Sequence, residues 1–384
     1  MSRRRRRLWT CVVGAAVATG CAKPPNPGDP LRGLTREERA SFDAGRQVFG
    51  RVFTPATGLG PLFNATACAE CHEKPAPGGS GDEVEVHVAT LLPSGVCDPF
   101  AKKGGLVIQQ HVTPALKAAL GIDKEPTPAG ATEAHRSSPE LLGLGLLDAV
   151  PDATILARAD PDDRDKDGIS GRPNHSLDGR IGRFGRKALV PTLREFNDGA
   201  FPVEIGVTDP AVPTEETIGG EPIPPGVDPV PEPEVDQAAT DAADAFVRFL
   251  APPAPLKLSS AAKSGRTIFS RIRCDACHVP TLETGDNRVK ALRYKEVSAY
   301  TDLLLHDMGP GLADICLGDA TPSEFRTAPL MGLRLSETFL HDGRTASVEE
   351  AVRLHGGEAQ ASRDKFVALS EPERKALLEF LKSL

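Results

Sequence analysis

The chain contains one pattern twice, as Cys68-Ala69-Glu70-Cys71-His72 and as Cys274-Asp275-Ala276-Cys277-His278. In each copy a short spacer separates two thiols, and a histidine directly follows the second thiol. This spacing lets both thiols add to the vinyl groups of one haem while the histidine reaches the iron from the same turn. A pair of cysteines alone would also suit a redox dithiol or half of a zinc site. Because the histidine is present in both copies, we predict two covalently bound haem c groups, with His72 and His278 as iron ligands.

The segments around the two patterns resemble each other. Residues 44–49 (AGRQVF) precede the first and residues 264–269 (SGRTIF) precede the second, and both have the apolar spacing of a short amphipathic helix. Each half also ends alike, in residues 245–250 before Pro252 and in residues 377–381 near the C-terminus. A helix before the haem pattern and a helix that closes the unit are the minimal plan of a cytochrome c. We therefore predict a mainly α fold with long loops, built from two cytochrome c-like haem domains in tandem.

The predicted organisation follows these landmarks. Residues 1–20 form a signal peptide and residues 21–35 an N-terminal tether. The first haem domain covers residues 36–252 and carries a long insertion, and the second covers residues 253–384. Within the insertion, residues 207–235 hold eight prolines and many acids, which is typical of an extended surface excursion.

The N-terminus has the character of an export signal. Arg3 to Arg7 form a charged region, Leu8 to Val17 are apolar, and the small residues Ala18-Thr19-Gly20 precede Cys21. The last four residues resemble the lipobox of bacterial lipoproteins, in which the cysteine is acylated. Either Cys21 is this lipid anchor or the signal is an ordinary cleaved one. We expect a periplasmic protein held to a membrane, the outer membrane, through Cys21.

Composition excludes several classes of protein. The 384 residues are 40% hydrophobic, and no apolar run reaches the roughly 20 residues of a spanning helix. The formal net charge is −8, and loss of Arg3 to Arg7 with the signal would leave 40 basic and 53 acidic residues, a net charge of −13. Such a surface repels nucleic acid and would suit a basic soluble partner.

Two cysteines remain outside the patterns and the N-terminus. In an oxidising compartment Cys97 and Cys316 could form a disulfide that joins the two halves. Two separate buried thiols are the alternative, and the sequence does not distinguish them.

A second metal site is suggested by the alternating carboxylates of Asp163, Asp165 and Asp167, followed by Gly168. These positions match the first half of an EF-hand calcium loop. Position twelve is Asn174 in place of the bidentate glutamate. The residues therefore predict either a Ca²⁺ site or a solvated acidic turn.

From about Asp43 onward the sequence resembles the bacterial dihaem oxidoreductases, relatives of the dihaem cytochrome c peroxidases. The resemblance rests on both haem patterns and on four further stretches, at residues 167–172 (DGISGR), 182–188 (GRFGRKA), 305–309 (LHDMG) and 339–344 (FLHDGR).

The resemblance implies roles for individual residues. Residues 202–206 (PVEIG) are similar to a Pro-x-Glu-Met stretch whose glutamate lies over the peroxide-binding haem, so Glu204 becomes the candidate acid/base. His341 matches the histidine of a His-Asp-Gly motif near the second haem and is the other catalytic candidate. His355 stands where the peroxidases place the sixth ligand of that haem as Met, and Met308 is a rival ligand. A histidine here would lower the haem potential relative to a thioether. The alternative for His355 is a surface histidine before the turn at Gly356 and Gly357.

His87 follows His72 at about the place where the family has a histidine that caps the first haem. The alternation of Val84, Val86 and Val88 also fits an ordinary strand. Both interpretations stay open.

The resemblance implies a peroxidase-like oxidoreductase. Hydrogen peroxide would be reduced at the first haem, with electrons passed through the second from a small periplasmic carrier, a cytochrome c or cupredoxin that is basic. One alternative is a non-catalytic dihaem electron carrier, in which both haems are six-coordinate. Another is an oxidase of a protein or organic substrate that acts through high-valent haem.

Overall fold

The computed structural model describes residues 24–384, and more of these residues lie in helices than in strands. A mainly α fold with long loops is therefore confirmed. The predicted signal peptide, residues 1–20, and the predicted lipid site, Cys21, lie outside the described residues. Within the described range no helix has the length and apolar character to cross a membrane.

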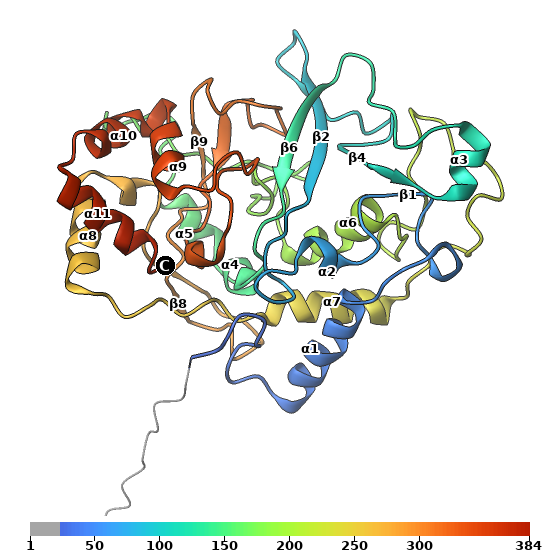
Figure 1. The fold of residues 1–384 in the computed structure, drawn as a ribbon, viewed down its shortest axis with the longest axis horizontal. Coiled ribbons are helices and arrows are strands. Elements are labelled where there is room, and N and C mark those ends of the chain that lie inside the picture. Colours follow the sequence, from blue (N-terminus) through green and yellow to red (C-terminus); the bar gives the residue numbers. More distant parts are fainter. Residues whose placement is uncertain (1–23) are drawn as a thin grey trace, which may run out of the picture.

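Two helix pairs stand apart in the molecule, one at the left and one at the bottom of Figure 1. In the first half α1 (Arg36–Phe49) packs against α7 (Gln237–Phe249), and in the second half α8 (Ser260–Arg271) packs against α11 (Glu371–Leu381). Each pair consists of the helix before a haem pattern and the helix that closes the same half. The helices predicted from the repeated segments are thus confirmed.

In both pairs a glycine allows the two helices to come into close contact. A Cβ atom at Gly45 of α1 would overlap the carbonyl oxygen of Ala242 in α7, and one at Gly265 of α8 would overlap that of Ala376 in α11. Only glycine lets the two backbones touch at these points. The packing below them is aromatic, with Phe49 and Phe246 centred 4.8 Å apart in the first pair.

A four-stranded antiparallel sheet forms in the first half of the chain. Its central strand β2 (Val84–Leu91) pairs along its length with β6 (Thr132–Ser137), with Glu85 opposite Arg136, and its other edge meets β3 (Cys97–Asp98) and β4 (Val107–Ile108). The remaining strands are short: β1 (Leu62–Phe63), β5 (His111–Val112), β7 (Leu282–Glu283), β8 (Glu296–Val297), β9 (Leu305–Asp307) and β10 (Glu324–Arg326). The remaining α-helices are α2 (Cys68–Cys71), α3 (Pro114–Leu120), α4 (Leu144–Asp148), α5 (Asp152–Leu156), α6 (Leu193–Ile205), α9 (Val348–Leu354) and α10 (Gln360–Val367).

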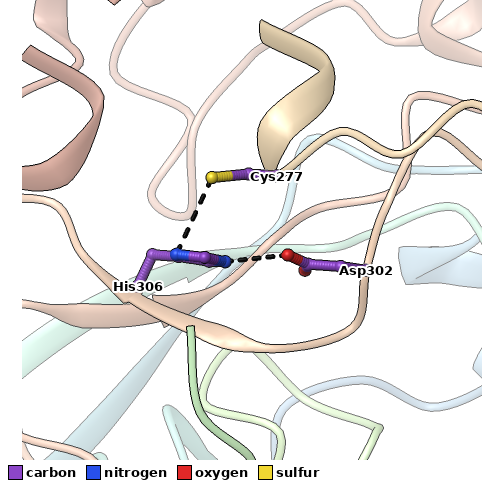
Figure 2. Close-up of side chains that lie close together, drawn as sticks. All are labelled: Cys277, Asp302 and His306. Atoms are coloured by element: carbon purple, nitrogen blue, oxygen red, sulfur yellow. Dashed lines mark hydrogen bonds and ion pairs between the residues drawn. The ribbon is translucent and has the colours of Figure 1, made fainter. Parts of the chain in front are cut away.

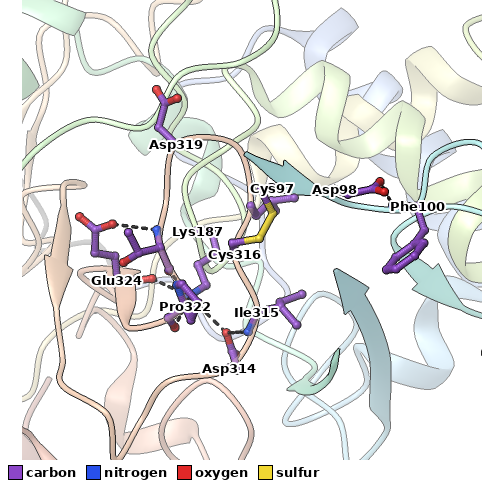
Figure 3. Close-up of a disulfide and its surroundings, with 12 residues drawn as sticks. Cys97, Asp98, Phe100, Lys187, Asp314, Ile315, Cys316, Asp319, Pro322 and Glu324 are labelled. Atoms are coloured by element: carbon purple, nitrogen blue, oxygen red, sulfur yellow. Dashed lines mark hydrogen bonds and ion pairs between the residues drawn. A yellow bond between two sulfur atoms is a disulfide. The ribbon is translucent and has the colours of Figure 1, made fainter. Parts of the chain in front are cut away.

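The halves are joined covalently and by a shared core. Cys97 and Cys316, 219 residues apart, form a disulfide between β3 and the loop before β10 (Figure 3). This confirms the first of the two alternatives for these cysteines. The largest cluster of buried apolar residues also contains Phe246 from the first half and Leu304 from the second.

Two predicted surface segments pack more closely than expected. In the proline-rich segment 207–235, Val207, Thr208 and Val235 are buried, so the prediction of a surface excursion was wrong for its ends. The cause is the pairing of the ends, because the amide of Val235 donates to the carbonyl of Thr208. The described part of the tether also runs along the end of α7, where the amide of Leu31 donates to the carbonyl of Phe249 at 2.7 Å.

Substitution of Gly45 or Gly265 by alanine tests the close helix contacts. We expect each change to lower the free energy of unfolding by about 1–3 kcal/mol, since the helices must separate to admit the methyl group. Gly199→Ala is the matched control, because it lies inside α6 with open space around its Cβ position and should stabilise by up to about 1 kcal/mol. Thermal unfolding followed by circular dichroism measures all three. Equal midpoints would contradict the role of the two glycines.

Candidate functional site

The first pattern presents a histidine with one nitrogen free. Cys68 and Cys71 bound the single turn of α2, and His72 follows it. Nδ1 of His72 lies 3.1 Å from the carbonyl oxygen of Gly79 and 3.0 Å from that of Pro139, so it must carry the proton and donate to them. Burial lowers the pKa of His72, so the ring is neutral and Nε2 keeps its lone pair. A neutral imidazole oriented in this way is what an iron ligand requires.

The second pattern repeats the arrangement. Cys274 and Cys277 lie on a short 3₁₀ turn, and Nδ1 of His278 donates to the carbonyl of Tyr300 at 3.0 Å. Burial, with a smaller contribution from nearby His355, lowers the pKa of His278 to about 4. All four cysteines of the two patterns are free thiols, as attachment to haem requires.

Glu204 lies near the first pattern, in the last turn of α6. Its carboxylate accepts a hydrogen bond from the side-chain amide of Asn64 at 3.2 Å, and its carbonyl accepts one from the backbone amide of Asn64 at 2.7 Å. Burial raises its pKa well above the ordinary value, and the neighbouring carboxylate of Glu85 adds to the rise. Its charge reaches both Cys68 and Cys71 and raises their pKa further. The structure therefore brings the predicted acid/base to the first haem pattern.

Glu85, which sequence reasoning missed, is the partner of Glu204. Both Glu85 and His87 lie on β2, two residues apart and on one face, and Nε2 of His87 lies 2.8 Å from the Glu85 carboxylate. Burial opposes ionisation of Glu85, but the hydrogen bond from His87 and the positive charges near Glu85 together outweigh it and lower the pKa. The predicted strand around His87 is thus confirmed, while a role of His87 as a cap of the first haem stays a prediction. In this arrangement His87 orients a carboxylate.

His355 lies near His278. It ends α9, and its Nδ1 lies 2.7 Å from the carbonyl oxygen of Ala351 in the same helix, which leaves Nε2 free. Burial lowers its pKa, as for the other two histidines. Met308 follows β9 and is half-buried, and its carbonyl lies beside Gly356. Both candidate sixth ligands therefore lie on adjoining segments.

His341 lies in a separate buried cluster. Its ring stacks on Phe325 with centroids 4.2 Å apart, and Nε2 lies 3.4 Å from the carboxylate of Asp314. Arg136 and Lys187 pair with the same carboxylate, close to the disulfide (Figure 3). Burial lowers the pKa of His341 to about 4 and that of Lys187 to about 8. The described contacts of His341 are with this cluster rather than with Glu204 or either pattern.

The calcium candidates gather as the spacing predicts. Carboxylate oxygens of Asp163, Asp165 and Asp167 lie within 4.8 Å of one another. Asn174 does not join them, because it is buried and its amide donates to the carbonyls of Lys187 and Leu317. Asp167 also pairs with Arg273, the residue before Cys274.

Two half-buried arginines suit the acidic propionates of haem. Arg186 interacts with Glu85 near the first pattern, and Arg326 interacts with Asp302 near the second. Burial lowers the pKa of each to about 10, and the two guanidinium groups repel each other. Nη1 of Arg326 is buried and has no hydrogen-bond partner among the described residues. A buried donor without a partner is costly, and a carboxylate ligand would satisfy it.

A comparison with protein families matches residues 131–384 to the family described as "Di-haem oxidoreductase, putative peroxidase". The chain belongs to the di-haem oxidoreductase family. The matched range holds Glu204, Arg326 and the second pattern, while the first pattern precedes it. The protein is thus a dihaem redox enzyme with two haem cofactors, and the residues at both patterns fit them.

Solved structures give distant likenesses to this di-haem oxidoreductase. Hydrazine synthase of Kuenenia stuttgartiensis is 14% identical with a TM-score of 0.43, and the alignment covers 99% of this chain and 100% of that one. A MauG-like protein associated with microbial copper homeostasis is 16% identical with a TM-score of 0.41, covering 96% and 95%. The diheme peroxidase BthA of Burkholderia thailandensis is 15% identical with a TM-score of 0.42, covering 90% and 86%. A comparison with curated proteins gave no match.

Arg326→Gln tests the pairing of this cation with a haem propionate. We expect the oxidoreductase to load both haems, and the reduction potential of at least one to become more negative, because a nearby cation favours the reduced form. Spectroelectrochemical titration measures both potentials. Arg36→Gln, an exposed change at the start of α1, is the control. Potentials that match the parent protein would exclude the pairing.

Proposed function

We propose that this di-haem oxidoreductase reduces hydrogen peroxide at the first haem, with Glu204 as the acid/base. The supporting observation is the raised pKa of a deeply set carboxyl beside Cys68 and Cys71. A carboxyl whose pKa is raised is a stronger base than an exposed carboxylate, and it can both accept and return a proton, as this reaction demands.

The haem would supply an iron centre at which peroxide binds and electrons arrive. Glu204 takes a proton from one peroxide oxygen and returns it to the other, so that the O–O bond breaks with water as the leaving group. Asn64 holds the Glu204 carboxylate by its amide. Two electrons and two further protons complete the reduction to a second water.

We propose that each helix pair and its pattern form one cytochrome c-like unit, with haem joined to Cys68 and Cys71 and to Cys274 and Cys277 through thioether bonds. His72 and His278 would ligate the irons. The free Nε2 of His355 supports a second histidine ligand at the second haem. Because imidazole lowers the haem potential relative to a thioether, this haem would suit a donor of moderate potential.

Electrons would come from a small, basic periplasmic carrier, a cytochrome c or cupredoxin. The acidic balance of the chain supports a basic partner. The Cys97–Cys316 disulfide supports export to an oxidising compartment, where Cys21 would anchor the protein to the outer membrane. Ca²⁺ at Asp163, Asp165 and Asp167 is supported by their clustered oxygens.

The alternative of a non-catalytic carrier requires a sixth ligand on both haems. His355 could supply one at the second haem. At the first haem, Nε2 of His87 is engaged by Glu85, which favours an open position there and therefore catalysis.

Glu204→Gln tests the acid/base. We expect both haems to load and peroxide turnover to fall at least about 100-fold, since general acid/base catalysis contributes about 10²–10⁴. Stopped-flow reaction of the reduced protein with peroxide measures the step directly. Glu195→Gln, at the exposed start of the same helix, is the control. Turnover close to that of the parent protein would refute the assignment.

Glu85→Gln tests the coupling of the two carboxyls. Glu204 must be ionised to accept a proton, so turnover rises with pH as Glu204 ionises. Because the negative charge of Glu85 raises the pKa of Glu204, its removal should move this acidic limb to lower pH. A pH profile of peroxide turnover reports the shift, with Glu133→Gln on β6 as the control. An unmoved limb, or one moved to higher pH, would contradict the coupling.

A further inference from the structure

The segment after His355 is held by one carboxylate. Glu358 accepts hydrogen bonds from the hydroxyl of Ser170 at 2.5 Å, the amide of Ser170 at 3.1 Å, Nδ1 of His306 at 2.7 Å and the amide of Asp307 at 3.3 Å. We call these four residues the Glu358 clamp. Its donors come from two distant parts of the chain, so the position of Glu358 is fixed from outside its own helix and loop.

His306 anchors the clamp in the interior. Its side chain is only 4% exposed, and its Nε2 lies 2.8 Å from the carboxylate of Asp302 while Nδ1 faces Glu358. Figure 2 shows Asp302 and His306 beside Cys277, the second thiol of the second pattern. Burial opposes protonation of His306, but hydrogen bonds to Asp302 and then to Cys277 and Glu358 raise its pKa well above the ordinary value. With both ring nitrogens donating, His306 ties Glu358 to the haem pattern.

The two segments that the clamp joins, residues 356–358 and residues 307–309, also touch through their backbones. A Cβ atom at Gly357 would overlap the carbonyl oxygen of Asp307, and one at Gly309 would lie 2.8 Å from the amide nitrogen of Gly357. Met308 lies between Asp307 and Gly309 on the clamped segment. The two candidate sixth ligands, His355 and Met308, are therefore carried by segments that cannot move independently while the clamp is closed.

We propose that Glu358 is a positioning residue that keeps His355, and not Met308, as the sixth ligand of the second haem. This inference rests on the proposed ligation by His355. Only two glycines separate His355 from Glu358. Without the carboxylate, only the backbone packing of this glycine turn against residues 307–309 remains, and no described hydrogen bond ties the turn to Ser170 and His306. His355 then gains freedom, and the thioether of Met308 competes for the iron.

The decisive experiment compares Glu358→Gln with the parent holoprotein. We expect the electron paramagnetic resonance signal of the bis-histidine haem to decrease, and the weak red absorption band of an iron–thioether bond to appear. The potential of the second haem should rise, because a thioether raises it relative to imidazole. Glu350→Gln is the control, since it removes an equal charge from the exposed side of α9. Ser170→Ala is a milder variant that removes one hydrogen bond of the clamp and should give the same changes at smaller amplitude.

His355→Ala separates this inference from the proposed ligation. If its spectra match the parent protein, ligation by His355 is wrong and the clamp has no ligand to position. If His355→Ala loses the bis-histidine signal while Glu358→Gln and Ser170→Ala keep it, the ligation stands and the inference is overturned. Loss of the signal in Glu358→Gln without a thioether band would overturn the part assigned to Met308.

Discussion

Each haem requires a neutral imidazole in the interior with one nitrogen free, and much of the fold meets this requirement. His72, His278 and His355 each direct Nδ1 to backbone carbonyls, which fixes the tautomer and the direction of Nε2. Burial lowers the pKa of all three rings, so none is held as a cation that could not bind iron. The carbonyls that hold His72 and His278 come from loops, while the carbonyl that holds His355 belongs to α9. The loop residue Tyr300 packs against Phe269 of α8 and Phe380 of α11. The long loops of this chain are therefore part of the ligand geometry.

The surroundings of the two haem patterns differ in charge, and this difference supports different chemistry. Near the first, burial of Glu204, together with the neighbouring carboxylate of Glu85, raises the pKa of Glu204 so that it holds a proton more strongly than an exposed carboxyl. Near the second, the imidazole of His306 lies between two carboxylates and pairs with both, through Nε2 with Asp302 and through Nδ1 with Glu358. A site that holds an exchangeable proton suits bond cleavage, whereas a site whose charges are compensated suits electron transfer with little rearrangement.

The sequence predicted the features whose spacing is local. The two haem patterns, the four helices around them and the cluster of Asp163, Asp165 and Asp167 depend on residues a few positions apart, and the structure contains each. The partners of these features could not be predicted, because they depend on contacts across the fold. Glu85 meets Glu204 from a strand 119 residues earlier, and Ser170 meets Glu358 across 188 residues. For Glu85 the sequence held one weak indication, because Glu85 and His87 fall on the same face of the strand that the alternating valines predict. The burial of Val207 and Val235 had no such signal, because proline-rich composition indicates exposure in general but not at the ends of a segment.

Long-range contacts also explain how the two haem regions could influence each other. Ser170 and Asp167 lie at the end of one loop, and this loop reaches Glu358 on one side of the second haem pattern and Arg273 on the other. Arg186 lies in the field of the Glu85 carboxylate, and Arg326 in the fields of Asp302 and of Arg186. Both arginines are half-buried, so solvent screens these charges less than it screens charges on an open surface. The charged groups near the first pattern are therefore linked to those near the second through two guanidinium groups, without any movement of the backbone.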